Sequence, residues 1–453
     1  MAGGRLASAR IGVAPPRPAA PLVRAVPYAD ILAYAASVGL ILIFSGSWGA
    51  ILTDYGAKSA DFLRNGYYPG YVLALLLVAS RPGATGLALL RSPLLIGLLL
   101  LTAASYFWSI APDLTLRRFP ALAFTTLAGV ALAARWRWRT LAEIIAVSMA
   151  IMAVASLLLG ALLPEMGRMQ EIFPGAWRGL WLEKNGLGNT MVIAVGAMLA
   201  AGVMVPERRR LWFGLTAIPL ALIVLSTSKT ALIVLVLSLA SLAFVALVRA
   251  GPLRAVIVTW LAVVAVIAAI LLITTQTELF FDLLGKDATL TGRTEIWSGV
   301  IQQMSGRPWL GFGYGAVWDD PSITGPKAWI GHQAKFLPAN AHSGWLEIYM
   351  ALGLGGVILF AAWLLQVWGQ SLWAAYTSAS AWLLMPLMTA YTVTMLSESI
   401  SMNWHDLRWI LFVALALKLA LGEETPTASA RVQAVRRSRP GSVPGIRRPK
   451  PSR

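Results

Sequence analysis

Residues 230–248 read TALIVLVLSLASLAFVALV, nineteen residues without one charged side chain. The hydrocarbon core of a bilayer is crossed by an α-helix of roughly 20 apolar residues, so this stretch predicts a membrane-spanning helix. The whole chain shares this character, since 58% of its 453 residues are hydrophobic, 13% are charged, and the mean hydropathy is +0.69. Soluble domains are about 45–50% apolar and about 25% charged, which excludes an ordinary soluble protein.

Comparable apolar stretches lie on both sides of residues 230–248. They cover residues 30–52, 67–80, 93–109, 119–135, 140–163, 185–205, 211–225, 255–273, 344–367, 372–395 and 406–421. The sequence therefore predicts an all-α polytopic membrane protein with about twelve transmembrane helices. Two stretches, 67–80 and 211–225, are shorter than a bilayer requires, so we expect tilted or broken helices there.

The positive charges predict the orientation of these helices. The chain has 37 Lys and Arg against 20 Asp and Glu, a formal net charge of +17. Most of the excess lies in short loops such as Arg135–Arg139 and in two terminal segments, 1–27 and 423–453. Because cytoplasmic loops are enriched in Lys and Arg, we expect both termini in the cytoplasm, flanking a transmembrane domain over 28–422. Both terminal segments are expected to be disordered, and the polybasic C-terminal one to touch anionic lipid rather than nucleic acid.

Several kinds of chemistry are excluded by what the sequence lacks. It contains no Cys and only three His, which excludes thiolate ligands and Cys nucleophiles and leaves little material for a metal site. It has no phosphate-binding loop of the form G-x-x-x-x-G-K-[ST], no G-x-S-x-G elbow and no H-E-x-x-H helix. We therefore expect no ATP-driven motor, no resident metal and no cofactor.

One connection between the predicted spans is much longer than the others. Residues 274–343 form an outer, periplasmic connection of about 70 residues, and loops longer than about 12–15 residues are usually functional or disordered. Ile296, Trp297, Val300, Ile301 and Met304 recur in it at helical spacing. We therefore expect an amphipathic helix that lies against the membrane surface or against the helix bundle.

Several cations lie on the predicted outer face, where the positive-inside rule disfavours them. They are Arg117, Arg118, Arg178, Lys184, Lys229, Arg293 and Arg307. Guanidinium and ammonium groups neutralise phosphate oxygens, and aromatic faces stack on sugar rings, so this set indicates a site for a pyrophosphate and a sugar. The alternative for single residues such as Trp177 and Lys229 is an anchoring role at the membrane interface.

His342 is the main candidate for a general base. It lies where the long loop joins the next predicted span, with Asn340 two residues before it and Glu347 five residues after it. An imidazole accepts a proton near neutral pH, as a base acting on a sugar hydroxyl must. Glu398 lies at the outer end of another span, where an acid usually needs a partner, and we expect it to pair with a cation or to tune a base.

The order and common location of the outer motifs resemble those of a known family. The motifs are Trp108-Ser109 with Pro112, Trp177-Arg178-Gly179 with Lys184-Asn185 and Gly188, Ser228-Lys229-Thr230, Gly292-Arg293 with Trp297, Pro308 with Gly311 and Gly313, and Ala341-His342 with Leu346-Glu347 and Gly353-Leu354-Gly355. Over roughly residues 30–420 the chain resembles the O-antigen ligase and polymerase superfamily of bacterial envelope proteins. Within that superfamily it is most similar to exopolysaccharide polymerases of the succinoglycan type.

The resemblance implies a membrane glycosyltransferase of the bacterial inner membrane whose active site faces the periplasm. Its donor would be an undecaprenyl-pyrophosphate-linked glycan, with Arg293 and Lys229 at the pyrophosphate and His342 at the acceptor hydroxyl. Lys229 stands where Arg is frequent in the family, and Lys lacks the bidentate geometry of Arg. The remaining candidates for binding the pyrophosphate or the glycan are Arg178, Lys184, Asn185, Arg117, Arg118, Trp177 and Glu347.

Three alternatives to a polymerase stay open at this point. The first is a ligase that transfers finished glycan to the lipid A core. The second is a polysaccharide flippase or another transporter, which is expected to carry ionisable residues deep in broken spans, whereas these charges gather at one face. The third is a membrane scaffold without chemistry. A polymerase is expected to bind membrane lipid and the lipid-linked glycan, and to meet chain-length regulators and export proteins.

Overall fold

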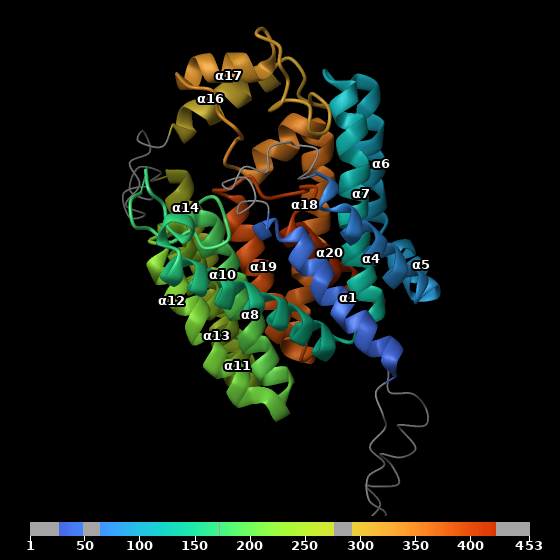
Figure 1. Ribbon diagram of the computed structural model, residues 1–453, viewed down its shortest axis with the longest axis vertical. Helices are drawn as coiled ribbons and strands as arrows, with labels where there is room; N and C mark the ends of the chain where they lie inside the picture. The colour runs from blue at the N-terminus through green and yellow to red at the C-terminus, as the bar shows by residue number, and fades with distance from the viewer. Residues whose placement is uncertain (1–26, 49–63, 172, 276–291, 423–453) are drawn as a thin grey trace, which may run out of the picture.

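A computed structural model describes residues 27–48, 64–171, 173–275 and 292–422 (Figure 1). The predictions for the two basic terminal segments fall outside these residues, apart from Pro27, and so does 276–291 of the long loop. Within the described ranges the secondary structure is helical, and an isolated bridge between Arg168 and Trp177 is the one β-type pairing. The predicted all-α class is confirmed for this part of the chain.

The helices follow one another with short connections, except in the long loop. In chain order they are α1 (Tyr28–Phe44), α4 (Tyr68–Ala79), α5 (Pro82–Leu90), α6 (Pro93–Ala104), η1 (Ser105–Trp108), α7 (Pro112–Arg135), α8 (Trp138–Leu162), α9 (Pro164–Gly167), α10 (Lys184–Met204), η2 (Pro206–Arg208), α11 (Arg209–Leu215), α12 (Ala217–Leu225), α13 (Lys229–Arg249), α14 (Pro252–Thr275), α16 (Arg293–Met304), α17 (Pro326–Ala334), α18 (Gly344–Thr377), α19 (Ala381–Met395) and α20 (Leu407–Leu421).

Six of the described helices are long and apolar enough to cross a membrane, namely α7, α8, α10, α13, α14 and α18. The helices α4 and α5 pass the same test together but are bent by 96°, which gives up to seven candidates. Three shorter apolar helices lie at 28–44, 93–108 and 381–395. The chain is therefore a multi-pass helical membrane protein, while the number twelve and the orientation in the membrane stay predictions.

The predicted spans coincide with helices, with two differences. The stretch 211–225 is broken at Thr216 into α11 and α12, as its length led us to expect. The prediction of one span over 372–395 is wrong, because α18 continues to Thr377 and α19 begins only at Ala381. Residues 372–377 are mostly apolar, like the first residues of α19. Composition alone therefore does not show where one helix ends and the next begins.

The helix α10 lies at the centre of one half of the bundle and packs against α8, α12, α13 and α19 (Figure 1). Small residues allow this close packing, as is common between membrane helices. A Cβ atom at Gly188 would lie 2.7 Å from the Cβ of Ala231 in α13, so only glycine lets α10 and α13 begin side by side. The other half of the bundle is built mainly on α7 and α20, which pack against each other.

The helix α18 is broken at Gly353, whose φ of 64° is readily adopted only by glycine. The break frees backbone groups, and the loop that follows α16 satisfies them. The amides of Phe312 and Gly313 donate to the carbonyls of Met350 and Ala351, at 2.7 and 3.1 Å. The amide of Leu354 donates to the carbonyl of Pro308 at 2.7 Å. The loop therefore fixes the short first part of α18, which begins next to His342.

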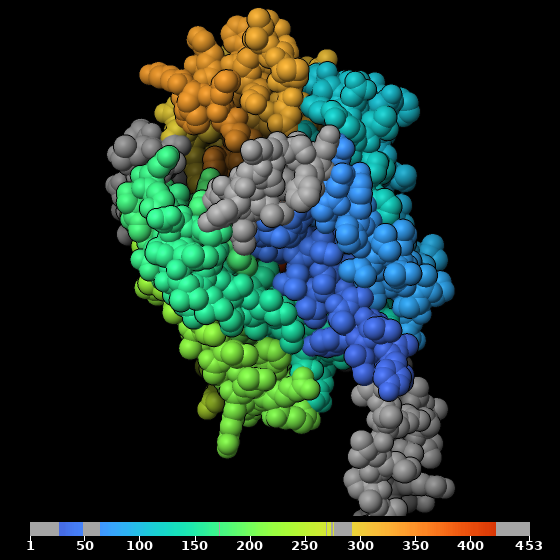
Figure 2. Space-filling view, viewed as in Figure 1, coloured from blue at the N-terminus to red at the C-terminus, as the bar shows by residue number. Residues whose placement is uncertain are grey.

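The segment 292–343 covers one end of the bundle, and Figure 2 shows it in yellow and orange above the other helices. Its helix α16 buries Ile296, Val300 and Met304 against α17 and α18. The predicted amphipathic helix is thus confirmed, and it lies against the bundle. At the opposite ends of the helices, ion pairs join Arg135 to Asp30, Arg139 to Glu207 and Arg208 to Glu143.

Candidate active site

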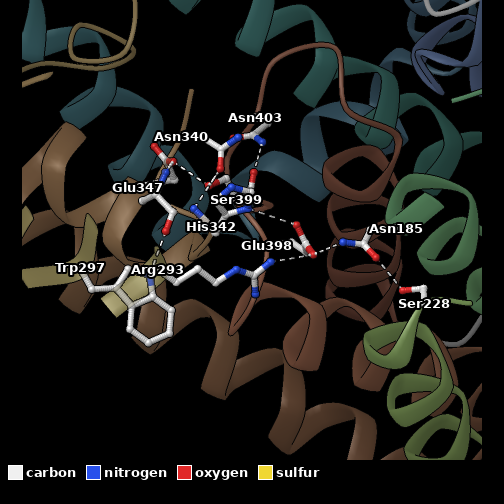
Figure 3. A network of polar contacts seen from close by, with 11 residues as sticks. Asn185, Ser228, Arg293, Trp297, Asn340, His342, Glu347, Glu398, Ser399 and Asn403 are labelled. Atoms are coloured by element: carbon white, nitrogen blue, oxygen red, sulfur yellow. Dashed lines mark hydrogen bonds and ion pairs between the residues drawn. The ribbon is translucent and has the colours of Figure 1, made fainter. Parts of the chain in front are cut away.

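The carboxylate of Glu398, in the connection between α19 and α20, lies at the centre of a polar network (Figure 3). Its Oε1 accepts a hydrogen bond from Asn185 Nδ2 at 3.3 Å and lies 3.5 Å from Nη2 of Arg293. Its Oε2 lies 3.7 Å from Nδ1 of His342. The network thus joins three residues that are far apart in the sequence, and it contains both predicted catalytic residues.

Two helices begin side by side at this network. Asn185 is the second residue of α10, and its Oδ1 accepts a hydrogen bond from the Ser228 hydroxyl at 2.8 Å. Ser228 is the N-cap of α13, and its Oγ also accepts the backbone N–H of Ala231 at 3.3 Å. The first N–H groups of a helix lack partners within the helix, and the helix dipole adds partial positive charge there.

The predicted cations Lys184 and Lys229 are the first residues of α10 and α13. The ammonium group of Lys184 lies 3.6 Å from the ring centroid of Phe173, and it is close enough to Lys229 to be affected by its charge. Arg293 is likewise the first residue of α16, and α18 begins two residues after His342. Four helices therefore begin near Glu398, which makes this end of the bundle favourable for an anion.

The backbone holds His342 in an uncommon conformation. Its φ is 48°, and its N–H donates to Oδ1 of Asn340 at 3.0 Å in a local turn just before Ser343, the N-cap of α18. Among the described residues Nδ1 of His342 has no hydrogen-bond partner, because Glu398 lies beyond hydrogen-bond distance. The side chain is 34% exposed, so a substrate can reach the ring from the solvent side.

Glu347 holds the turn that contains His342. One carboxylate oxygen accepts the backbone N–H of Ala341 and the hydroxyl of Ser399, each at 2.7 Å, and the other accepts the indole N–H of Trp318 at 2.7 Å. On the other side of the turn, the indole of Trp297 donates to the carbonyl of Ala341 at 2.9 Å. Glu347 therefore positions the turn, and its predicted contact with glycan stays a prediction.

The other predicted binding residues lie outside the Glu398 network. Trp177 is buried against Gly160, with the guanidinium of Arg168 5.0 Å from its ring centroid. The Nε of Arg178 donates to the carbonyl of Met166 at 2.8 Å. These contacts pack the connection between α9 and α10 against the helices, and the predicted binding roles of Trp177 and Arg178 stay predictions.

The pair Arg117 and Arg118 at the start of α7 is also separate from Glu398. Arg117 is exposed, and its Nε donates to the backbone carbonyl of Asp113 at 3.3 Å. Arg118 forms an ion pair with Asp319, donates to the carbonyl of Gly315, and lies 4.7 Å from the ring centroid of Trp404. The predicted set of cations is therefore divided between two places at the same end of the bundle.

The sequence alone did not identify Ser399, Trp318 and Asn403 as parts of the site. Asn403 donates to the carbonyl of Ser399 at 2.6 Å and so continues the network beyond Glu347. The sequence signal for Ser399 is the polar run Ser397-Glu398-Ser399 between two apolar spans, and the prediction from the sequence includes only Glu398 of this run. Among the described residues, no three His, Asp or Glu side chains gather as a group that could hold a metal ion.

The site residues fall largely within a region that is similar to known proteins. Residues 214–361, which include Lys229, Arg293 and His342, match the O-antigen ligase family. The chain is also 32% identical, over 267 residues, to the exopolysaccharide production protein ExoQ of Rhizobium meliloti (strain 1021). This match covers 56% of the chain and 59% of the relative, less than two thirds of its length. Both similarities support the resemblance to the O-antigen ligase and polymerase superfamily that the outer motifs indicate, and the second supports its exopolysaccharide type.

Proposed function

We propose that the chain is a glycosyltransferase that polymerises undecaprenyl-pyrophosphate-linked oligosaccharide repeat units into exopolysaccharide on the periplasmic face of the inner membrane. The observation that carries this proposal is the meeting of Arg293, His342 and Asn185 around Glu398, where four helices begin. The similarity to an exopolysaccharide production protein supports the choice of polymer. Membrane lipid, a chain-length regulator and export proteins are the partners proposed for it.

The proposed reaction is a displacement at the anomeric carbon of the donor glycan. An acceptor hydroxyl oxygen forms the new bond to that carbon, and the bond from carbon to the phosphate oxygen breaks, so the lipid pyrophosphate leaves with the electron pair. Arg293, with Lys184 and Lys229 at the helix starts, stabilises the developing negative charge of the leaving group. His342 accepts the proton of the hydroxyl.

Glu398 has two parts in this scheme. One carboxylate oxygen lies 3.5 Å from Nη2 of Arg293 and compensates part of the positive charge at the helix starts. Its other oxygen faces the imidazole of His342, so the carboxylate can stabilise the imidazolium that forms when His342 takes the proton. An Arg guanidinium has five N–H donors, and a single contact with Glu398 leaves others for phosphate oxygens.

The test is complementation of a strain in which the gene has been deleted. Deletion is expected to abolish high-molecular-weight exopolysaccharide and to leave single repeat units on the lipid carrier. Arg293→Ala and His342→Ala are expected to reproduce this phenotype while the protein is still present in the membrane fraction. Lys327→Ala is the matched control, because it removes a cation in α17, at the same end of the helix bundle. This variant is expected to restore polymer. Near-normal polymer from both site variants would contradict the proposal.

A ligase is the second candidate, because the family that matches residues 214–361 is described as O-antigen ligase. The same deletion strain distinguishes the two activities. If full-length polymer accumulates on its lipid carrier instead of single repeat units, the chain is a ligase. A loss of lipid-linked repeat units from the outer leaflet, with no change in polymer attachment, would instead indicate a flippase.

A further inference from the structure

A cavity of about 390 Å³ lies beside the turn that contains His342. Its walls include Trp318, Trp404, Asn340, Asn403, Arg118 and Asp319, whereas Arg293, His342 and Glu398 are not part of its lining. Sites for small molecules usually measure about 300–1,000 Å³, with apolar walls and a few placed polar groups. The volume and the mixture of two indole rings with two amides fit this description.

Among the described residues, the charged side chains of the cavity wall are Arg118, Asp319 and Glu347, so the wall has no excess of positive charge. Arg118 is paired with Asp319, and the carboxylate of Glu347 accepts three hydrogen bonds from neutral donors. The cations proposed for the pyrophosphate, Lys184, Lys229 and Arg293, are the first residues of α10, α13 and α16 and are not part of the lining. The cavity therefore favours an uncharged, hydroxyl-rich ligand over an anion.

The two amides present a free donor and a free acceptor. Oδ1 of Asn340 accepts the backbone N–H of His342, and Nδ2 of Asn403 donates to the backbone carbonyl of Ser399. Because these backbone groups have fixed roles, the orientation of each amide is fixed as well. The hydrogen bonds of these two amides among the described residues use Oδ1 of Asn340, which also accepts the hydroxyl of Ser399, and Nδ2 of Asn403, and leave Nδ2 of Asn340 and Oδ1 of Asn403 to a ligand. A sugar hydroxyl, which both donates and accepts, matches this pair.

The indole of Trp404 supplies an aromatic wall that is itself held in place. The guanidinium of Arg118 lies 4.7 Å from its ring centroid, and the ring of Tyr314 meets it edge-on at 5.7 Å. A ring held by such neighbours loses little conformational entropy when a ligand stacks on it. The apolar C–H face of a pyranose is a suitable partner for an aromatic surface of this kind.

His342 lies between this cavity and the cations. Its backbone bonds to Asn340, a residue of the cavity wall, and its imidazole faces Glu398, which contacts Arg293 (Figure 3). Building on the proposed function, we propose that the cavity binds a neutral sugar residue of the acceptor glycan and presents its hydroxyl to His342. The lipid pyrophosphate of the donor then occupies the opposite side, at Arg293.

The test measures glycan binding separately from turnover. Full-length protein in lipid nanodiscs is mixed with repeat-unit oligosaccharide released by mild acid from host lipid, and binding is followed by saturation-transfer NMR. Trp404→Ala and Asn403→Ala are expected to weaken binding about tenfold or more, while Trp404→Phe stays within about threefold of wild type because it keeps an aromatic face. Trp329→Ala removes an exposed Trp outside the cavity and is expected to change nothing.

Arg293→Ala separates this proposal from the proposed function. It is expected to bind free oligosaccharide as wild type does but to transfer nothing from the lipid-linked donor. If wild type binds oligosaccharide through Trp404 but performs no transfer, the proposed function fails and the sugar site stands. Unchanged affinity in both Trp404→Ala and Asn403→Ala, or weaker binding of the lipid-linked donor alone, overturns the sugar site. If Trp404→Ala does not fold, Asn403→Ala and Trp404→Phe decide the question.

Discussion

Glu347 holds the turn that contains His342, and we predict how much stability is lost when Glu347 is replaced by Ala or by Gln. The carboxylate accepts hydrogen bonds from the N–H of Ala341, the hydroxyl of Ser399 and the indole of Trp318. Hydrogen bonds to a charged group contribute about 1.5–3 kcal/mol each, so Glu347→Ala, which loses three, is expected to cost at least about 4 kcal/mol. Glu347→Gln keeps one acceptor oxygen for two of these donors, and places an NH₂ group against the third.

The third donor allows a double-mutant cycle. In Glu347→Gln the new NH₂ group faces the indole N–H of Trp318, so two donors oppose each other. Trp318→Phe removes the indole N–H and with it this conflict. We therefore expect Glu347→Gln to be less destabilising in the Trp318→Phe background than in wild type, by about 1–2 kcal/mol.

Thermal unfolding of the purified proteins in one detergent measures the stability ranking, and polymer formation in membranes measures the functional effect. A displacement of about 1 Å at a reacting group can cost about 10²-fold in rate, so Glu347→Ala is expected to lose activity even in the fraction that remains folded. Equal melting temperatures for Glu347→Ala and wild type, or additive effects in the cycle with Trp318→Phe, would refute the positioning role of Glu347.

Three further predictions concern single residues around the site. Ser228→Ala removes the N-cap of α13 and the bond to Asn185, and is expected to cost about 0.5–2 kcal/mol and to lower polymer yield, measured by thermal unfolding and by complementation. Gly353→Ala would place a Cβ 2.2 Å from a backbone atom of the preceding loop, so it is expected to reduce activity strongly, whereas Gly369→Ala, in the same helix with open space around it, is not. Burial lowers the pKa of His405 from 6.5 to about 4, so the folded protein takes up this proton less readily than the unfolded chain, and stability is expected to fall as the pH drops from about 6.5 to about 4. Replacement of His405 by Phe is expected to flatten that dependence in pH-dependent melting curves, and an unchanged slope would show that another group causes it.

The positions of the helices follow largely from the sequence, because burial in lipid demands continuous apolar stretches. The helix α5 was missed, since residues 82–90 contain two glycines and lie between two basic residues, which is the composition of a loop. The end of α18 was misplaced because the chain is apolar both before its true end at Thr377 and after it, at the start of α19. Both errors arise where the local composition agrees with two structures.

The contents of the site were predictable only in part. The cations on the predicted outer face are exceptions to the positive-inside rule and could be recognised as such. Two predicted catalytic residues, Arg293 and His342, both lie near Glu398. Both residues are close to Glu398, which is separated from His342 in the sequence by the helices α18 and α19. This is a tertiary contact that no local sequence pattern encodes. Arg118 and Trp177 have the same residue types as the network members, yet Arg118 pairs with Asp319 and Trp177 packs against Gly160. Residue type alone does not distinguish these roles.

The first residues of α10 and α13 carry a further argument about the ligand. Helix starts favour acidic side chains, because the dipole is positive there, yet these helices begin with Lys184 and Lys229. Neither has an acidic residue in the first turn, and only α10 has one beside it, the N-cap Glu183. Each such placement costs a fraction of a kcal/mol, roughly 0.3–1. Conflicts between a local rule and the fold are expected at functional sites. Glu398 contacts Arg293 and Asn185 beside these helix starts. An external anion with several charges, as a lipid pyrophosphate has, would add to the negative charge there and relieve the conflict.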